Sequence, residues 1–168
     1  NPKLAVALTG RSGEALEEYK KLMLKLNNEV VAAAPEDLLI NTHVCRGNYH
    51  STFFSSGAYD SVADLLFGEE NVNAYYLEYD DERSGGFAPL AKITGNKKVV
   101  LGLVTTKTPA LENKELVINR IHEAAKYVPL DRLYLSPQCG FASCEIGNKL
   151  TEEEQWAKLK LVKEIAEE

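Results

Sequence analysis

Apolar and polar residues follow two different periodicities along the chain. Apolar residues recur every three or four positions in four segments, residues 14–34, 58–67, 112–127 and 151–166. That spacing predicts amphipathic helices, each with one face toward a core. The helical segments alternate with β-rich runs, which predict strands at residues 37–45, 73–80, 98–106 and 133–138. A further short helix is expected at residues 87–93, after the glycine pair at 85 and 86.

Two of the predicted helices show a well-defined apolar face. In the helix at 14–34, which ends before Pro35, this face comprises Leu16, Tyr19, Leu22, Leu26 and Val30. The helix at 151–166 begins with Thr151 followed three residues later by Glu154, the pattern of a capping box. Its expected buried residues are Trp156, Leu159, Val162 and Ile165.

Each predicted strand is followed by a helix, and the strands end near Cys45, Asp80, Thr106 and Cys139. An interval of roughly 30 residues is typical of right-handed crossovers between parallel strands. The fold class is therefore expected to be α/β with a mostly parallel sheet, in one domain of 168 residues. A complete eight-stranded α/β barrel needs about 250 residues, so the chain is long enough for only part of one.

Composition and charge exclude several classes of partner. The net charge is −6, and no run of Lys and Arg is present, so neither nucleic acid nor an anionic membrane surface is expected as a partner. No apolar run reaches the 18 or so residues of a membrane span, and no signal-peptide pattern opens the chain. The expected location is the cytoplasm. Three cysteines, an odd number, are expected to be free thiols or metal ligands rather than a disulfide framework.

Potential metal ligands gather at the predicted strand ends. His43 and Cys45 are two residues apart on one strand and project to the same side. Glu78 ends the second strand, and Cys139 ends the fourth. Imidazole and thiolate with one carboxylate suit Zn²⁺. For any one residue, a buried structural thiol or a hydrogen-bonded core histidine is the simpler interpretation, but the combination from three strands favours zinc.

The segments around these residues resemble a known family. They read HVCRGN at 43–48, YLEYD at 76–80 and LSPQCGF at 135–141, and they are similar to the catalytic domain of cobalamin-independent methionine synthase. The closest likeness is to short bacterial homologues that lack the large N-terminal half. The resemblance implies that residues 1–168 are the C-terminal portion, strands five to eight, of a (β/α)8 TIM barrel.

The resemblance also implies an activity and a ligand set. In that family, zinc would be held by His43, Cys45, Glu78 and Cys139, and a methyl group would pass from 5-methyltetrahydrofolate, usually polyglutamylated, to homocysteine. Glu78 is the ligand that the homocysteine thiolate is expected to displace. The longer enzymes carry a catalytic histidine where this chain has residues 102–107 without one, so Lys107 or Thr105 is the candidate replacement and the methyl donor stays open.

Further candidates accompany the proposed ligands. His50, in the loop after the first strand, is a candidate proton donor. Three residues are expected to contact or position substrate, namely Arg46, Asn48 and Asp80.

Three alternatives to the methionine synthase activity stay open. The chain could transfer a methyl group between another donor and another thiol, or it could be a barrel like uroporphyrinogen decarboxylase, which needs no zinc. It could also be a non-catalytic, zinc-stabilised domain. A ligand set that spreads from His43 to Cys139 and includes a carboxylate favours an open catalytic site over a structural one.

A half-barrel would expose two sheet edges and an apolar interior. The expected partner is therefore an N-terminal half-barrel or a second copy of the chain. These 168 residues are expected to carry the zinc ligands but little of the substrate pocket.

Overall fold

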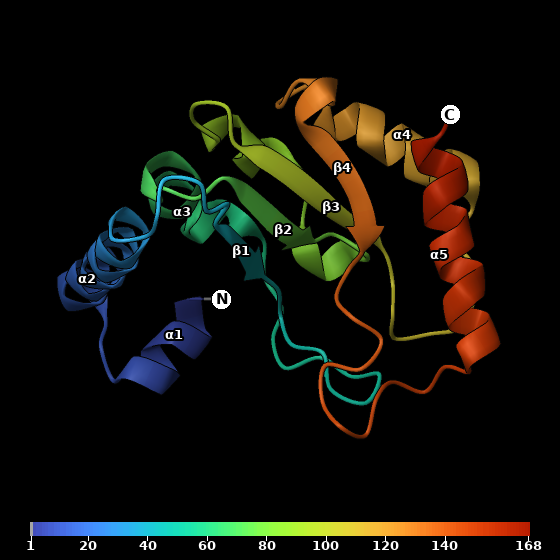
Figure 1. The fold of residues 1–168 in the computed structure, drawn as a ribbon. Coiled ribbons are helices and arrows are strands. Elements are labelled where there is room, and N and C mark those ends of the chain that lie inside the picture. Colours follow the sequence, from blue (N-terminus) through green and yellow to red (C-terminus); the bar gives the residue numbers. More distant parts are fainter. Residues whose placement is uncertain (1) are drawn as a thin grey trace.

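In the computed structural model, which describes residues 2–168, helices cover one side of a four-stranded parallel sheet (Figure 1). The strands lie in the order in which they follow along the chain, β1 (Asn41–Val44), β2 (Ala74–Glu78), β3 (Lys98–Val104) and β4 (Leu133–Pro137). The helices are α1 (Pro2–Thr9), α2 (Gly13–Ala32), α3 (Ala63–Glu69), α4 (Lys114–Ala124) and α5 (Glu152–Ala166). The predicted α/β class and the parallel arrangement are confirmed.

The observed elements are shorter than the predicted ones. The first strand covers only Asn41–Val44 of the expected 37–45, because Leu38 and Leu39 are exposed and precede the pairing with β2. The helix expected at 58–67 is interrupted, since a 3-10 turn at Tyr59–Ser61 precedes α3. The helix expected at 87–93 is a 3-10 helix, Ala88–Lys92. Helix α1 carries no prediction from the sequence.

The main core lies between the sheet and the helices α3 and α4. Tyr75, Leu77 and Tyr79 of the second strand and its extension are almost fully buried on this side. The two tyrosine rings belong to a continuous aromatic cluster. The ring centroids of Tyr75 and Phe67 are 5.1 Å apart, and those of Tyr79 and Phe87 are 4.6 Å apart. This packing fixes β2 at the centre of the sheet and holds its carboxyl end against the helical layer.

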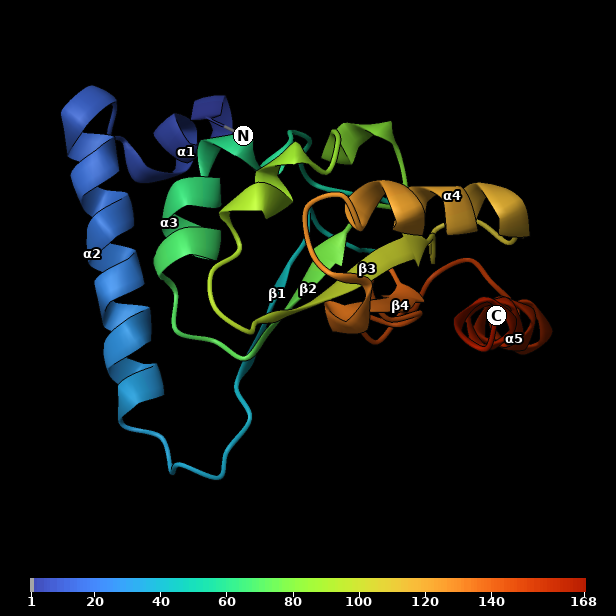
Figure 2. The ribbon, with the colours of Figure 1, turned by 90° about the horizontal axis from the view of Figure 1, so that it is seen from above.

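Two predicted helix faces are only partly correct, since Leu16 and Ile165 are buried as expected but other members of both faces are exposed. Figure 2 shows α2 and α5 at the two ends of the sheet, with α3 and α4 on one side of it. Within residues 2–168, α2 packs against α1 and α3, α5 packs against α4 and β4, and the outer side of each end helix is exposed. On α5, Trp156 is 59% exposed, and the buried residues are Lys158, Leu161 and Ile165. On α2, Leu16 is buried, but the outer positions are exposed, namely Leu22, Leu26 and Val30.

The second side of the sheet carries exposed aromatic residues. Tyr76 on β2 and Tyr134 on β4 are 40% and 44% exposed. Within the described residues, β1 pairs only with β2, and β4 pairs only with β3. These are the open edges and the open inner face of four consecutive βα units, as the half-barrel prediction requires. In the same part of the chain, no helix is long and apolar enough to cross a membrane.

Candidate metal centre

The three predicted nitrogen and sulfur ligands meet at the carboxyl end of the sheet. His43 lies on β1 and Cys45 directly follows it, whereas Cys139 follows β4 at the opposite edge of the sheet. The ligand atoms of all three nevertheless lie within 4.8 Å of one another. The His43 Nε2 atom is 3.3 Å from Cys139 Sγ. The loops after β1 and β4 run side by side beyond the strand ends (Figure 1). Residues that follow the two edge strands therefore come into contact.

The three side chains shift one another's pKa values. Two hydrogen bonds lower the pKa of the Cys45 thiol to about 4, and the one with Cys139 contributes more than the one with His43. The same hydrogen bond and burial raise the pKa of Cys139, and the hydrogen bond with Cys45 raises that of His43. These shifts favour the thiolate form of Cys45, which is the form of cysteine that binds a divalent cation.

The donor set fits a zinc ion. Tetrahedral Zn²⁺ bonds of 2.0–2.3 Å place ligand atoms roughly 3.5 Å apart, and the His43–Cys139 separation of 3.3 Å is close to that value. One imidazole and two sulfur atoms also favour zinc over Mg²⁺ or Ca²⁺, because those two ions prefer oxygen ligands.

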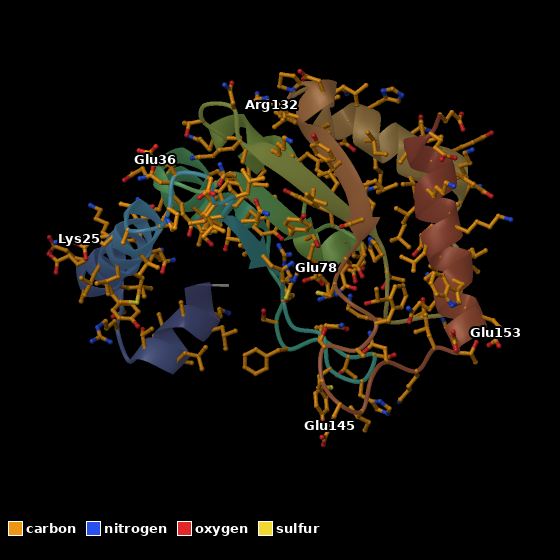
Figure 3. All side chains as sticks on the ribbon, viewed as in Figure 1. Lys25, Glu36, Glu78, Arg132, Glu145 and Glu153 are labelled. Atoms are coloured by element: carbon orange, nitrogen blue, oxygen red, sulfur yellow. The ribbon has the colours of Figure 1, made fainter. Side chains whose placement is uncertain are left out.

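Glu78, the fourth predicted ligand, lies beside this group but outside it. Figure 3 shows it at the end of the sheet. The fully buried carboxylate accepts hydrogen bonds from the backbone N–H of Arg46 and, at 3.0 Å, from Arg83 Nη2. Lys107 Nζ lies 3.5 Å from the same oxygen. Glu78 as a metal ligand stays a prediction.

Arg46 and Lys107, two other candidates, are largely occupied by contacts inside the protein. Arg46 Nε donates to the Gly57 carbonyl at 2.7 Å, and its guanidinium lies 4.3 Å from the centre of the Tyr59 ring. Lys107 Nζ makes a buried ion pair with Asp80 at 2.6 Å. The Lys107–Asp80 ion pair therefore lies next to the Glu78 carboxylate. The side-chain contacts of Arg46 hold in place its own backbone N–H, which donates to Glu78.

Asn48 and His50 lie in the loop after β1 and contact the loop after β4. Asn48 Nδ2 donates to the Gly140 carbonyl at 2.8 Å, and His50 Nδ1 lies 3.0 Å from the Gly147 carbonyl. Asn48 also borders a cleft of about 510 Å³ that opens at the metal-ligand group. The cleft is lined by, among others, His43, Cys45, Asn48, Tyr76, Ser136 and Cys139.

Sequence reasoning missed two residues that hold Glu78. Arg83 pairs with Glu78 and, at 2.7 Å, with Asp81. The Tyr59 hydroxyl accepts from the Glu78 N–H at 2.9 Å and donates to the Val44 carbonyl at 2.7 Å, so it bridges β1 and β2 where they end. A signal for Arg83 existed, since a lone cation follows three acidic residues at 80–82; Tyr59 had none.

The chain is similar to several known proteins. A family model described as the catalytic domain of cobalamin-independent synthase matches residues 15–168. An uncharacterized Bacillus subtilis protein, YxjG, is 52% identical over 155 residues, which make up 92% of this chain and 41% of that protein. A Pyrococcus horikoshii methionine synthase is 29% identical over 101 residues, 60% of this chain and 26% of its own length.

A solved structure shows the same fold. It comes from Listeria monocytogenes and was assigned as a vitamin-B12 independent methionine synthase. It superposes with a TM-score of 0.70 at 40% identity, over 94% of this chain and 42% of that one. The chain thus spans about two fifths of the length of these relatives, and the half-barrel prediction is confirmed.

Proposed function

The chain belongs to the cobalamin-independent synthase catalytic-domain family, and we propose that it carries the zinc site of a methyltransferase that converts homocysteine to methionine. The methyl donor in this proposal is 5-methyltetrahydrofolate in its polyglutamate form. One observation carries the proposal, the convergence of His43, Cys45 and Cys139 to within 4.8 Å. Residues 1–168 would be the C-terminal portion of the catalytic barrel.

His43, Cys45 and Cys139 would hold the zinc ion, with Glu78 as the fourth and most easily replaced ligand. Zinc, when bound, supplies a positive charge that keeps thiol sulfur deprotonated and nucleophilic at neutral pH. The protein provides a second set of partners for the Glu78 carboxylate, the Arg46 N–H and the Arg83 guanidinium. A carboxylate with two such environments suits a site in which one position opens for substrate.

The remaining candidates would act on the methyl donor and the substrate. Lys107 is the proposed proton donor, since its ammonium group stands between Asp80 and Glu78. Asp80 holds that ammonium group in place. Asn48, on the rim of the cleft, and Arg46 would position substrate. His50 would be a second proton donor, although its Nδ1 atom faces the Gly147 carbonyl.

The open inner face supports a partner for this chain. Tyr76 and Tyr134 are exposed on it, and β1 and β4 each have a free edge among the described residues. We propose that an N-terminal half-barrel, or a second copy of the chain, covers this face and completes the cleft. Size-exclusion chromatography with light scattering tests the second possibility, and a monodisperse 18.6 kDa species would contradict it.

Zinc stoichiometry tests the metal site directly. The chain, loaded with zinc and desalted, is expected to retain one ion, and Cys139→Ser is expected to lose it. Cys144→Ser is the matched control, because Cys144 is also a half-buried free cysteine in the same loop but is not in the ligand group. Equal zinc content in Cys139→Ser and Cys144→Ser would refute the site.

Substrate binding separates a catalytic zinc site from a structural one. Homocysteine added to the zinc-loaded chain is expected to release a proton, measured in weakly buffered solution with an indicator, because its thiol binds as thiolate. A closed structural site releases none. Methionine formation from methyltetrahydrofolate triglutamate, measured with the full-length protein, then tests the donor.

A further inference from the structure

The loops that carry the metal-ligand candidates are tied together by one side chain, that of Asn148. This residue lies between β4 and α5, and its Nδ2 donates to the Thr106 carbonyl at 2.7 Å and to Asn48 Oδ1 at 2.9 Å. Its Oδ1 accepts from the Ser51 N–H at 2.9 Å. The amide orientation follows from these partners, because only oxygen can accept from Ser51 and only nitrogen can donate to a carbonyl. Asn148 thus contacts the loops that follow β1 and β3 from the loop that follows β4.

Neighbours of Asn148 extend the same connection. His50 Nδ1 lies 3.0 Å from the Gly147 carbonyl, and the Lys149 N–H donates to Ser51 Oγ at 2.8 Å. Three consecutive residues, 147–149, therefore hold the two residues His50 and Ser51. We call these contacts the loop clasp. In Figure 1 the two loops lie side by side beyond the ends of the strands.

The loop clasp stabilises a turn whose backbone conformation is unfavourable for the residues that form it. Tyr49 and Thr52 exchange two backbone hydrogen bonds, at 3.1 and 2.8 Å, around His50 and Ser51. The φ angles of His50 and Ser51 are +44° and +64°. A turn with positive φ at both central positions favours Asn and Gly. His50 and Ser51 are held in this conformation by contacts with the surrounding structure. The contacts from residues 147–149 supply that enforcement.

The clasp leads directly to the metal-ligand group. Asn148 holds Asn48 Oδ1, and Asn48 Nδ2 in turn donates to the carbonyl of Gly140, the residue next to Cys139. Asn48 itself is three residues after Cys45. A continuous series of hydrogen bonds therefore sets the spacing between the two loops that carry the two thiols.

We propose that Asn148 is a positioning residue that sets the relative placement of Cys45 and Cys139 and thereby the affinity of the site for zinc. This inference rests on the proposed zinc site. Asn148 lies outside the metal-ligand group and acts through the two loops. Residues hydrogen-bonded directly to metal ligands commonly change metal affinity about 10–100-fold when replaced, and Asn148, one step further out, is expected at the lower end of that range.

The variant Asn148→Asp tests the proposal. Aspartate keeps the size of the side chain and an acceptor for Ser51, but it places an oxygen against the Thr106 carbonyl and Asn48 Oδ1. The matched control is Asn96→Asp, in the exposed turn before β3. Zinc dissociation constants are measured by competition with a chromogenic chelator. Asn148→Asp is expected to weaken zinc binding about 10-fold and to alter the cobalt–thiolate charge-transfer bands, whereas Asn96→Asp leaves both unchanged.

Two further measurements keep the outcomes separable. Asn148→Ala removes the contacts without adding a charge and is used if Asn148→Asp does not fold. Hydrogen exchange of the metal-free chain is expected to rise in residues 46–52 and 139–149 together. Wild-type affinity in a folded Asn148 variant overturns the inference. If the wild-type chain binds no zinc, the proposed function fails, and unchanged exchange in both loops then overturns the positioning role as well.

Discussion

Gly102, in the middle of β3, tests how closely the strands must approach beneath the metal-ligand group. An added Cβ would lie 2.6 Å from the Leu77 carbonyl oxygen and 2.7 Å from Gln138 Cα. Both are backbone atoms, so no side-chain rotation can relieve the contact. Ordinary contact begins at 3.4 Å, so Gly102→Ala must push the neighbouring strands apart by several tenths of an ångström.

The cost of this change follows from two opposing effects. Overpacking of a rigid core costs about 1–3 kcal/mol, and this site belongs at the upper end because both neighbours are backbone. Replacing glycine by alanine also lowers the conformational entropy of the unfolded chain, which stabilises the folded state by about 0.4–1 kcal/mol. We expect Gly102→Ala to lower the free energy of unfolding by about 2 kcal/mol, which shifts the urea midpoint by about 1 M for a slope near 2 kcal/mol/M.

The control and the second readout separate this clash from a general effect of alanine. Gly86→Ala adds a Cβ at an exposed position where nothing lies within 4 Å, so its midpoint is expected to equal that of wild type or exceed it slightly. Gly102→Ala should also weaken zinc binding, because the displaced Gln138 directly precedes Cys139. Equal urea midpoints for the two variants would show that the strands can separate freely and that the reasoning is wrong.

Three other substitutions have defined outcomes. Tyr59→Phe leaves the buried N–H of Glu78 without its hydroxyl partner and is expected to cost about 2 kcal/mol in urea unfolding; a cost near zero would refute the bridge between β1 and β2. Lys158→Met leaves the Glu112 carboxylate without its buried cation and is expected to cost about 2 kcal/mol, less than a fully buried pair because Glu112 is partly exposed; an unchanged melting temperature would contradict this. Burial raises the pKa of Glu70 above 4.5, so the protonated form favours folding and stability falls as the pH rises through the raised value. Glu70→Gln is expected to remove that part of the decline in melting temperature as the pH rises above the ordinary pKa of a glutamate, and identical pH profiles would argue against it.

Much of the fold follows from local sequence pattern. Helix and strand alternation places four strands and their crossovers, since apolar periodicity reports which residues must face a core. The same pattern brings Cys45 and Cys139 to strand ends. It cannot show that Trp156 is exposed, because the buried stripe of an end helix depends on which neighbour covers it. A helix with one flank open buries Lys158 instead, with its ammonium group paired to Glu112.

Residue type and spacing alone identify His43, Cys45 and Cys139 as metal-ligand candidates, because parallel strands necessarily end on one side of a sheet. The partners of Glu78 and the hydrogen bonds of Asn148 are decided only in the folded chain. Asn48 and Asn148 are 100 positions apart, and no local pattern records a contact that arises where two loops from opposite edges of a sheet run side by side. The chemistry of the site is therefore readable from its residues, whereas its geometry depends on long-range packing.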